Sequence, residues 1–225
     1  AAFELLIGHV FNKLYNEEKI PTLTLAKAGQ YSENNYFGKK SGLLDQIGVA
    51  FGGISYIDFE NISSPIVDPI AIDFDIRYVI INTGGSHAHL SHLYSSIPQD
   101  MYNASHKLGV NFLRETSLEV LESNKHLLSD IEYSRSKHYF TENIRVQKAF
   151  KAIKEKDLQT FFKMINESRI SSTNDLKNMM VENEYEGSPL EACDIAVKAM
   201  EGHGAIKING GGFAGSCIAF IENSH

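Results

Sequence analysis

The segment that most constrains this chain is a glycine run at residues 210–215, with the sequence GGGFAG. Short apolar segments flank it at 205–208 and 216–221, and both are typical of strands. Glycine allows backbone conformations that other residues rarely adopt. A strand-loop-strand order differs from the phosphate-binding P-loop and the dinucleotide-binding turn, because both need a helix directly after the glycines. Taken alone, the segment favours a tight hairpin whose main-chain N–H groups could approach an anion or another loop.

Composition limits the class of protein. The chain has 225 residues and is 43% hydrophobic, which is enough for one large domain or two small ones. Its net charge of −7, with no clustering of basic residues, argues against nucleic acid as a partner. No apolar run approaches the roughly 20 residues of a membrane span, so we expect no membrane insertion. Two cysteines, Cys193 and Cys217, are too few for a disulfide framework and favour a reduced, cytoplasmic setting.

Apolar periodicity and turn signals predict the elements. The pattern of residues 1–16 predicts a helix buried along one side. Further helices are expected at 22–36, 41–51, 130–156, from 158 onward, and at 188–201, with the helices around residue 157 forming a hairpin. Strands are expected at 54–59 and 77–82 in addition to the pair around the glycine run. Pro65 and Pro69 are taken to bracket a connector.

Two acids are candidates for chemistry. Glu33 lies late on a predicted helix, and Asp45 lies twelve residues further on, beyond a turn that contains Gly38 and Gly42. Such a turn could bring both carboxylates to one pocket, where one would hold a divalent cation and the other would take or orient a hydroxyl proton. The alternative stays open, since acids near helix ends usually face solvent or serve as caps.

The other reactive residue types give weaker signals. His87, His89 and His92 are spaced by two and three residues, which does not place them on one helical face, so we do not expect a zinc site. His138 should be partly buried or paired with an acid. No activating base is evident for the two cysteines, which we take to be core thiols rather than nucleophiles.

Several segments together resemble galactokinases of the GHMP kinase superfamily, in order along nearly the whole chain. These segments are 33–38 (ENNYFG) and 41–46 (SGLLDQ), Asn82-Thr83 with His87 and Tyr94, His138 with Glu142-Asn143 and Arg145, 166–168 (NES), and 210–215 with Cys217. Several motifs in register are far more specific than any one of them.

The resemblance implies transfer of the ATP γ-phosphoryl group to the anomeric hydroxyl of galactose, with Mg²⁺. By this resemblance Asp45 corresponds to the catalytic carboxylate, and Glu33 takes the position of the acid near the metal. Gly42 would line the sugar by its backbone, and Tyr94 would hydrogen-bond it. The resemblance also implies that the triple glycine, Gly210, Gly211 and Gly212, supports the phosphate-binding segment. ATP and the sugar would be the small-molecule partners.

The resemblance also implies an α+β fold. Residues 1–74 would be the later part of a GHMP kinase N-terminal domain, and 75–225 a C-terminal domain with helices on a small, ferredoxin-like antiparallel sheet. Relatives carry an arginine-containing sugar segment and a GLSSSAA phosphate loop upstream, and Ala1-Ala2 resemble the end of that loop. They also continue beyond His225 with a helix and a strand. We therefore expect a fragment that is inactive alone and exposes apolar surface in its first domain, with self-association or disorder as the result.

The sequence leaves two alternatives to galactokinase activity. One is a GHMP kinase for another sugar, such as galacturonate or arabinose. The other is a non-catalytic family member that senses sugar. Residues 95–98 (SSIP) replace an arginine-containing helix start, and Asn209 stands where Thr is usual, which leaves the sugar open.

Overall fold

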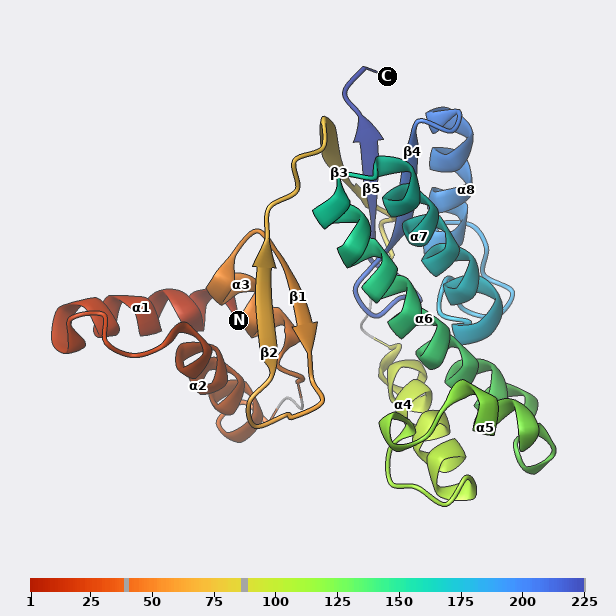
Figure 1. Ribbon diagram of the computed structural model, residues 1–225, viewed down its shortest axis with the longest axis horizontal. Helices are drawn as coiled ribbons and strands as arrows, with labels where there is room; N and C mark the ends of the chain where they lie inside the picture. Colours follow the sequence, from red (N-terminus) through yellow and green to blue (C-terminus); the bar gives the residue numbers. More distant parts are fainter. Residues whose placement is uncertain (39–40, 86–88, 225) are drawn as a thin grey trace. The chain divides into compact units, whose positions relative to one another are not determined.

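A computed structural model describes residues 1–38, 41–85 and 89–224. The chain forms two compact units, Ala1–Ile72 and Asp73–His225. The sequence places the domain boundary after residue 74. Figure 1 shows the elements of each unit.

The first unit has three helices and a β-hairpin in its described residues. They are α1 (Ala2–Asn16), α2 (Thr22–Asn35), α3 (Leu44–Phe51), β1 (Ile54–Asp58) and β2 (Ile66–Ile70). Ala26, Leu43 and Ile47 form its buried centre, against which apolar residues of the antiparallel hairpin pack. Strand β2 contains Pro69, so the expectation of a connector there was wrong. Pro69 is tolerated because each hairpin strand has a free edge, where a missing N–H costs no ladder hydrogen bond.

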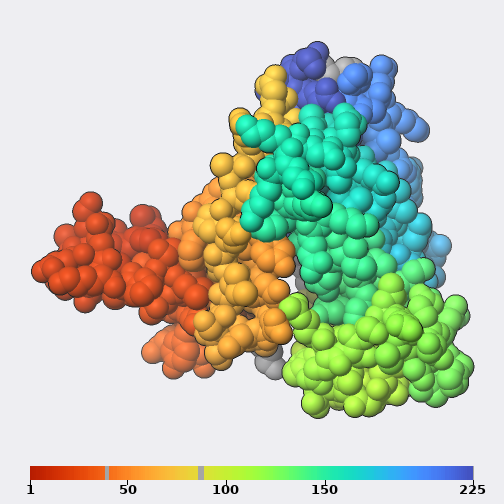
Figure 2. Space-filling view, in the orientation of Figure 1, coloured from red at the N-terminus to blue at the C-terminus, as the bar shows by residue number. Residues whose placement is uncertain are grey.

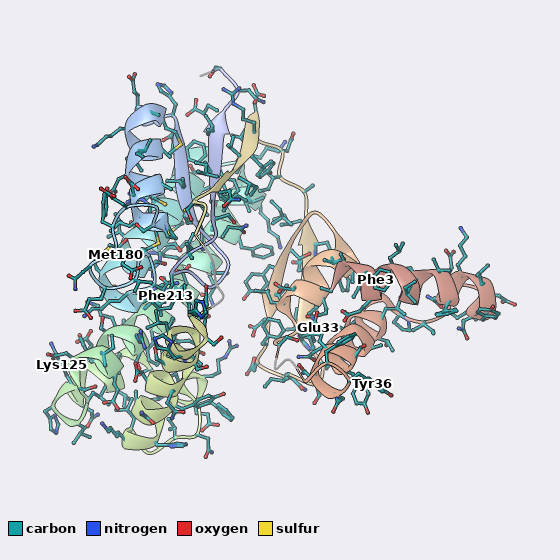
Figure 3. The ribbon with its side chains drawn as sticks, turned by 180° about the vertical axis from the view of Figure 1, so that it is seen from behind. Phe3, Glu33, Tyr36, Lys125, Met180 and Phe213 are labelled. Atoms are coloured by element: carbon teal, nitrogen blue, oxygen red, sulfur yellow. The ribbon has the colours of Figure 1, made fainter. Side chains whose placement is uncertain are left out.

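Helix α1 forms as predicted, but its apolar stripe is not buried. Phe3 is 74% exposed and Leu14 67% exposed, whereas only Leu5 and Asn12 of this helix are buried. The other large apolar side chains exposed on it are Leu6, Ile7, Val10, Phe11 and Tyr15. Figure 3 labels Phe3 on this helix, and the red surface in Figure 2 includes this segment. The prediction that one side of this helix is buried was therefore wrong, because its apolar stripe is exposed. The exposure agrees with the separate expectation that this unit exposes apolar surface.

The second unit is an α+β domain built on a three-stranded antiparallel sheet. Its strands are β3 (Ile76–Asn82), β4 (Gly204–Asn209) and β5 (Ser216–Glu222), in the order β3-β5-β4. Its main helices are α4 (Ser91–Lys107), α5 (Leu118–Ser123), α6 (Asp130–Glu155), α7 (Leu158–Ser171) and α8 (Pro189–Met200). Short 3₁₀ turns occur at Leu113–Glu115 and Lys125–Leu127, and a π-helical turn occurs at Ser172–Leu176. The mixed architecture confirms the predicted fold class.

Helices cover both faces of this sheet. On one face Ile206, Ile208 and Cys217 pack with Cys193 and Met200 of α8. On the other face Phe220 makes an edge-to-face contact with Phe161 of α7, with ring centroids 5.2 Å apart. This two-sided burial explains why β4 and β5 are apolar at successive positions rather than alternating.

Capping residues fix where the long helices begin. Ser129 and Glu132 form a reciprocal capping box at the start of α6. Ser188 caps α8, with Pro189 in the first turn, as the sequence predicts. Helices α6 and α7 pack against each other as the expected hairpin. No helix in the described part of the chain is both long and apolar enough to cross a bilayer.

The exposed stripe of α1 predicts self-association. Replacing Phe11 and Leu14 by Ser removes two of its large exposed apolar side chains. We expect weaker concentration-dependent association of the chain, because less apolar surface leaves water on contact. Sedimentation velocity across a concentration series measures this. The control is His9→Ser, an exposed change on the same helix that removes no large apolar side chain. Equal association in both variants would contradict this role of the stripe.

Candidate functional site

The glycine-rich loop joins β4 to β5 and has an unusual backbone. Gly210 and Gly212 have φ values of 100° and 90°, which glycine adopts at little cost. Phe213 also has a positive φ, 60°, and is 5% exposed. The Ala214 N–H donates to the Gly212 carbonyl at 2.7 Å, so Phe213 is the centre of a three-residue turn. A non-glycine residue held in this region marks a conformation that its surroundings impose.

Tyr94 of α4 lies against this loop. Its hydroxyl donates to the Gly212 carbonyl at 2.7 Å, and its ring meets the Phe213 ring edge-on at 5.6 Å. A Cβ on Gly211 would lie 2.7 Å from the Tyr94 ring, so only glycine fits beneath it. Burial raises the pKa of the Tyr94 phenol, which keeps it protonated as a donor. The structure thus brings together Tyr94 and the triple glycine, which the resemblance assigns to one site.

Two further residues support the loop. The main-chain N–H and the hydroxyl of Thr83 both donate to the Gly215 carbonyl, at 2.8 and 2.9 Å. Asn178 also contacts the loop, through its carbonyl oxygen and its side-chain amide. Beside the loop lies a hollow of about 290 Å³, with Thr83, Phe213 and Glu184 among its lining residues. Figure 3 marks Phe213 within the loop.

Asp45 lies in the first unit, as the second residue of α3. Its side chain is exposed and forms no hydrogen bond or ion pair within the described part of the chain. The next two residues, Gln46 and Ile47, are 1% and 0% exposed and anchor the helix turn that carries Asp45. Gly42 is exposed in the segment before α3. The structure records no contact between Asp45 and Glu33, so their shared pocket stays a prediction.

The segment leading to Asp45 is held by helix α2. The Ser41 N–H donates to Asn34 Oδ1 at 2.8 Å, and Gln30 donates to the Ser41 carbonyl at 3.1 Å. These hydrogen bonds fix where the chain enters α3 after the turn. They give Asn34, one of the resemblance residues, a local structural role.

Glu33 lies beside the N-terminus of α1. It is 8% exposed, and its Oε1 accepts a hydrogen bond from the Ala1 ammonium group at 2.9 Å. That bond raises the pKa of the ammonium group. Figure 3 labels Glu33 on α2. Carboxylate oxygens such as those of Glu33 are among the ligands that Mg²⁺ prefers.

Among the described residues, no group of three or more His, Cys, Asp or Glu side chains is placed so that it could hold a metal ion. Mg²⁺ in phosphoryl-transfer sites is commonly held by one or two carboxylates together with substrate phosphates, so one protein carboxylate suffices for the fit. His92 opens α4 and His89 lies shortly before it, whereas His87 lies outside the described residues.

A partly buried polar cluster contains other residues of the resemblance. The Glu142 carboxylate of α6 accepts from Ser168 of α7 at 2.6 Å and from Arg145 Nε at 2.7 Å, and it lies 3.4 Å from Lys207 Nζ of β4. Burial opposes its ionisation, but Lys207, Ser168 and Arg145 together hold the pKa of this carboxyl below its ordinary value. The cluster ties two helices to the strand that leads into the glycine-rich loop.

His138 and the cysteines are structural, as predicted. His138 is 7% exposed, and its Nδ1 lies 3.0 Å from the Ser171 hydroxyl, which donates to Asp175. Burial lowers the pKa of His138, so it is neutral at pH 7. Cys193 and Cys217 are fully buried free thiols with their Sγ atoms 3.5 Å apart.

Comparisons with known proteins agree with this arrangement. No family model matches the chain. The galactokinase of Limosilactobacillus reuteri (strain DSM 20016) is 28% identical over 234 residues, covering 100% of this chain and 57% of the relative. That of Glaesserella parasuis serovar 5 is 30% identical over 226 residues, covering 99% and 57%. This chain thus spans little more than half the length of the curated relatives it matches.

Solved structures show the same relationship. The crystal structure of Lactococcus lactis galactokinase complexed with galactose matches with a TM-score of 0.79 and 27% identity, covering 99% of this chain and 57% of that chain. L. major mevalonate kinase, crystallised with R-mevalonate, matches with a TM-score of 0.60 and 16% identity, covering 98% and 56%.

The fold is therefore that of the GHMP kinases, which include both of these solved proteins. Within that class the chain is similar to galactokinases along its whole length.

The close approach at Gly212 predicts that alanine is poorly tolerated there. A Cβ on Gly212 would lie 2.2 Å from the Asn178 carbonyl oxygen, whereas a Cβ on Gly210 meets nothing within 4 Å. Both positions have positive φ, so Gly210→Ala is a matched control for backbone strain. We expect Gly212→Ala to lower the free energy of unfolding by about 2 kcal/mol more than Gly210→Ala, because it adds a main-chain clash to the strain. Urea denaturation of both variants measures this, and equal losses would contradict the geometry.

The lowered pKa of Glu142 predicts that its contribution to the stability of the protein is lost in acid. Its folded-state pKa is lowered, so its stabilisation is present above its unfolded pKa and is lost as pH falls through the folded pKa. We expect Glu142→Gln to cost about 2 kcal/mol at pH 7, with the difference from wild type shrinking in acid. Urea unfolding at several pH values measures this. Glu155→Gln, an exposed change on the same helix, should show little difference at any pH. A pH-independent loss in Glu142→Gln would refute the assignment.

Proposed function

We propose that this chain is part of a galactokinase, which transfers the γ-phosphoryl group of ATP to the anomeric hydroxyl of galactose. The observation that carries the proposal is the match along 99% of the chain to a galactokinase solved with galactose. The contact of Tyr94 with the glycine-rich loop supports it, since two of the expected site segments meet. A cytoplasmic location is part of the proposal.

Asp45 is proposed as the residue that receives or orients the proton. The sugar oxygen would attack the γ-phosphorus, the bond to the ADP oxygen would break, and the hydroxyl proton would pass to the Asp45 carboxylate. An exposed carboxylate in the first turn of a well-anchored helix suits this role, because it can reach a ligand while its backbone stays fixed. Phosphoryl transfer demands positioning and charge neutralisation rather than a covalent intermediate.

Glu33 is proposed to hold Mg²⁺, which would neutralise charge on the phosphates of ATP. Its support is a carboxylate side chain that is only 8% exposed. The neighbouring N-terminus of α1 favours anions through its free N–H groups. Phosphate at this helix end and the metal at Glu33 would therefore be adjacent and electrostatically complementary.

Tyr94 and Gly42 are proposed to bind the sugar. The phenol proton of Tyr94 is donated to the Gly212 carbonyl, so a sugar hydroxyl would have to donate to the phenol oxygen. Gly42 would approach the sugar by its backbone, and nothing lies within 4 Å of the position that its Cβ would take. Gly210, Gly211 and Gly212 would support the phosphate-binding segment.

Asp45→Asn tests the proposed chemistry in the gene product that carries this chain. We expect phosphorylation of galactose to fall by roughly 100-fold or more, because the amide cannot accept the proton, while ATP binding is retained. Coupled release of ADP and calorimetric titration with ATP measure the two quantities. Glu18→Gln makes the same carboxylate-to-amide change at an exposed turn and should leave both unchanged. Full activity in Asp45→Asn would remove the assignment.

A panel of sugars distinguishes the alternatives. Galactose, galacturonate and arabinose are compared as acceptors under the same conditions. Preference for either of the last two would indicate a GHMP kinase for another sugar. Sugar binding without transfer to any acceptor would indicate a sensor.

A further inference from the structure

We infer that Asn178 is a positioning residue that aims the glycine-rich loop at the substrate. The inference rests on the proposed phosphoryl transfer. Asn178 would not touch the reacting atoms; it would set the direction of the Gly212 N–H group, which we assign as a donor to an anionic oxygen of the bound substrate.

Asn178 contacts the loop with both its main chain and its side chain. Its carbonyl oxygen accepts from the Phe213 N–H at 2.5 Å, and its Nδ2 donates to the Gly211 carbonyl at 3.0 Å. The residue is 3% exposed. These two bonds join Asn178 to consecutive peptide groups of the loop.

The geometry of a trans peptide converts these bonds into directions. In each peptide unit the C=O and N–H point in opposite directions. The Gly212–Phe213 unit is held at both ends, because Tyr94 donates to its oxygen and Asn178 accepts from its N–H. In the Gly211–Gly212 unit, Asn178 holds the oxygen, so the Gly212 N–H points away from Asn178. No residue in the described ranges accepts a hydrogen bond from that N–H. Gly212 is buried, so this N–H is a buried donor without an acceptor among the described residues, and an oxygen of the bound substrate would supply one.

Asn178 is itself held by an unusual turn. It follows the π-helical turn Ser172–Leu176 and Lys177, whose φ is 58°. π-Helical turns are rare and occur often at functional sites. Ser134 and Arg135 of α6 donate to the Asp175 and Leu176 carbonyls at 2.6 and 3.3 Å, which fixes this turn against the long helix.

Arg135 also connects the two supports of the loop. Its guanidinium group donates to Asp100 at 2.5 Å and to Ser96 at 2.9 Å, both on α4, the helix that carries Tyr94. The contacts form a closed ring that runs from α4 through Arg135 to the turn, from Asn178 to the loop, and from the loop through Tyr94 back to α4. A shift of either support would therefore move the loop.

The buried amide of Asn178 is costly unless it positions the loop. Its Oδ1 is buried and has no hydrogen-bond partner among the described residues. An unpaired buried acceptor lowers stability, so an apolar side chain would fill the same space more favourably. The benefit that offsets this cost is the Nδ2 donor toward Gly211.

The test compares Asn178→Asp with Asn174→Asp in the chain as it stands. Both variants replace an amide by a carboxylate, but Asn174 is exposed in the π-helical turn. Asn178→Asp removes the donor toward Gly211, and we expect amide hydrogen exchange in residues 209–216 to become about 10-fold faster relative to wild type. Asn174→Asp should leave it unchanged. Below the carboxyl pKa the protonated acid can donate again, so the ratio to wild type should return toward one.

Kinetics in the gene product that carries this chain supply the second readout. We expect Asn178→Asp to lower kcat about 10-fold while KM for the sugar changes little, because a misplaced donor weakens the transition state more than substrate binding. A gene product without kinase activity would refute the proposed function, and the exchange experiment would still decide the role of Asn178. Unchanged exchange and unchanged kcat in a folded Asn178→Asp would overturn the inference.

Asn178→Ala keeps the test decisive if the charged variant fails to fold. It removes the donor and the unpaired oxygen together while the main-chain carbonyl remains. We expect faster exchange in residues 209–216 and the same fall in kcat, without recovery in acid. Wild-type values for both quantities would overturn the inference.

Discussion

The glycine-rich loop of the second unit depends on two hydrogen bonds that hold the peptide group between Gly212 and Phe213 at both ends. Tyr94 holds the oxygen of this peptide and Asn178 holds its N–H, at 2.7 and 2.5 Å. Without such contacts a run of three glycines would sample many conformations, because glycine loses more conformational freedom on ordering than any other residue. The hydrogen bonds and the packed rings fix the conformation of the loop, which its glycine-rich sequence alone does not determine. Flexibility in the sequence is thus combined with a fixed conformation in the fold.

Local signals predicted most of the fold. Periodicity located α1, α2, α6 and α7, and capping residues located the start of α8. Strand β2 was missed because Pro69 was read as a breaker, although it lies on a hairpin where each strand has a free edge. The stripe of α1 was assigned to burial because amphipathicity shows only that one helix face is apolar. What covers that face is a tertiary property, and in this chain Phe3 and Leu14 are exposed.

The candidate site was predictable only in part. Tyr94 and the triple glycine came from motif resemblance, and the structure shows them in contact. Asn178 gave no signal, because residues 172–187 have no regular apolar pattern and its role depends on a π-helical turn fixed by Ser134 and Arg135. Asp45 and Glu33 remain assigned by resemblance. Asp45 is exposed and Glu33 is 8% exposed, and this difference in burial fits the two distinct roles proposed for them.

The two units offer different kinds of stabilisation to the proposed reaction. The first provides charged side chains near helix N-termini, where fixed dipoles and carboxylates can organise a metal and phosphates. The second provides a backbone loop whose N–H direction is set by buried contacts. Glu142 of α6 contacts Ser168 of α7 and Lys207 of β4 within the same unit. These contacts fix strand β4, which leads into the loop. Preorganised donors lower a barrier only if they do not reorient during the reaction. The costly buried amide of Asn178, with its unpaired oxygen, is therefore best understood as part of what keeps the loop from moving.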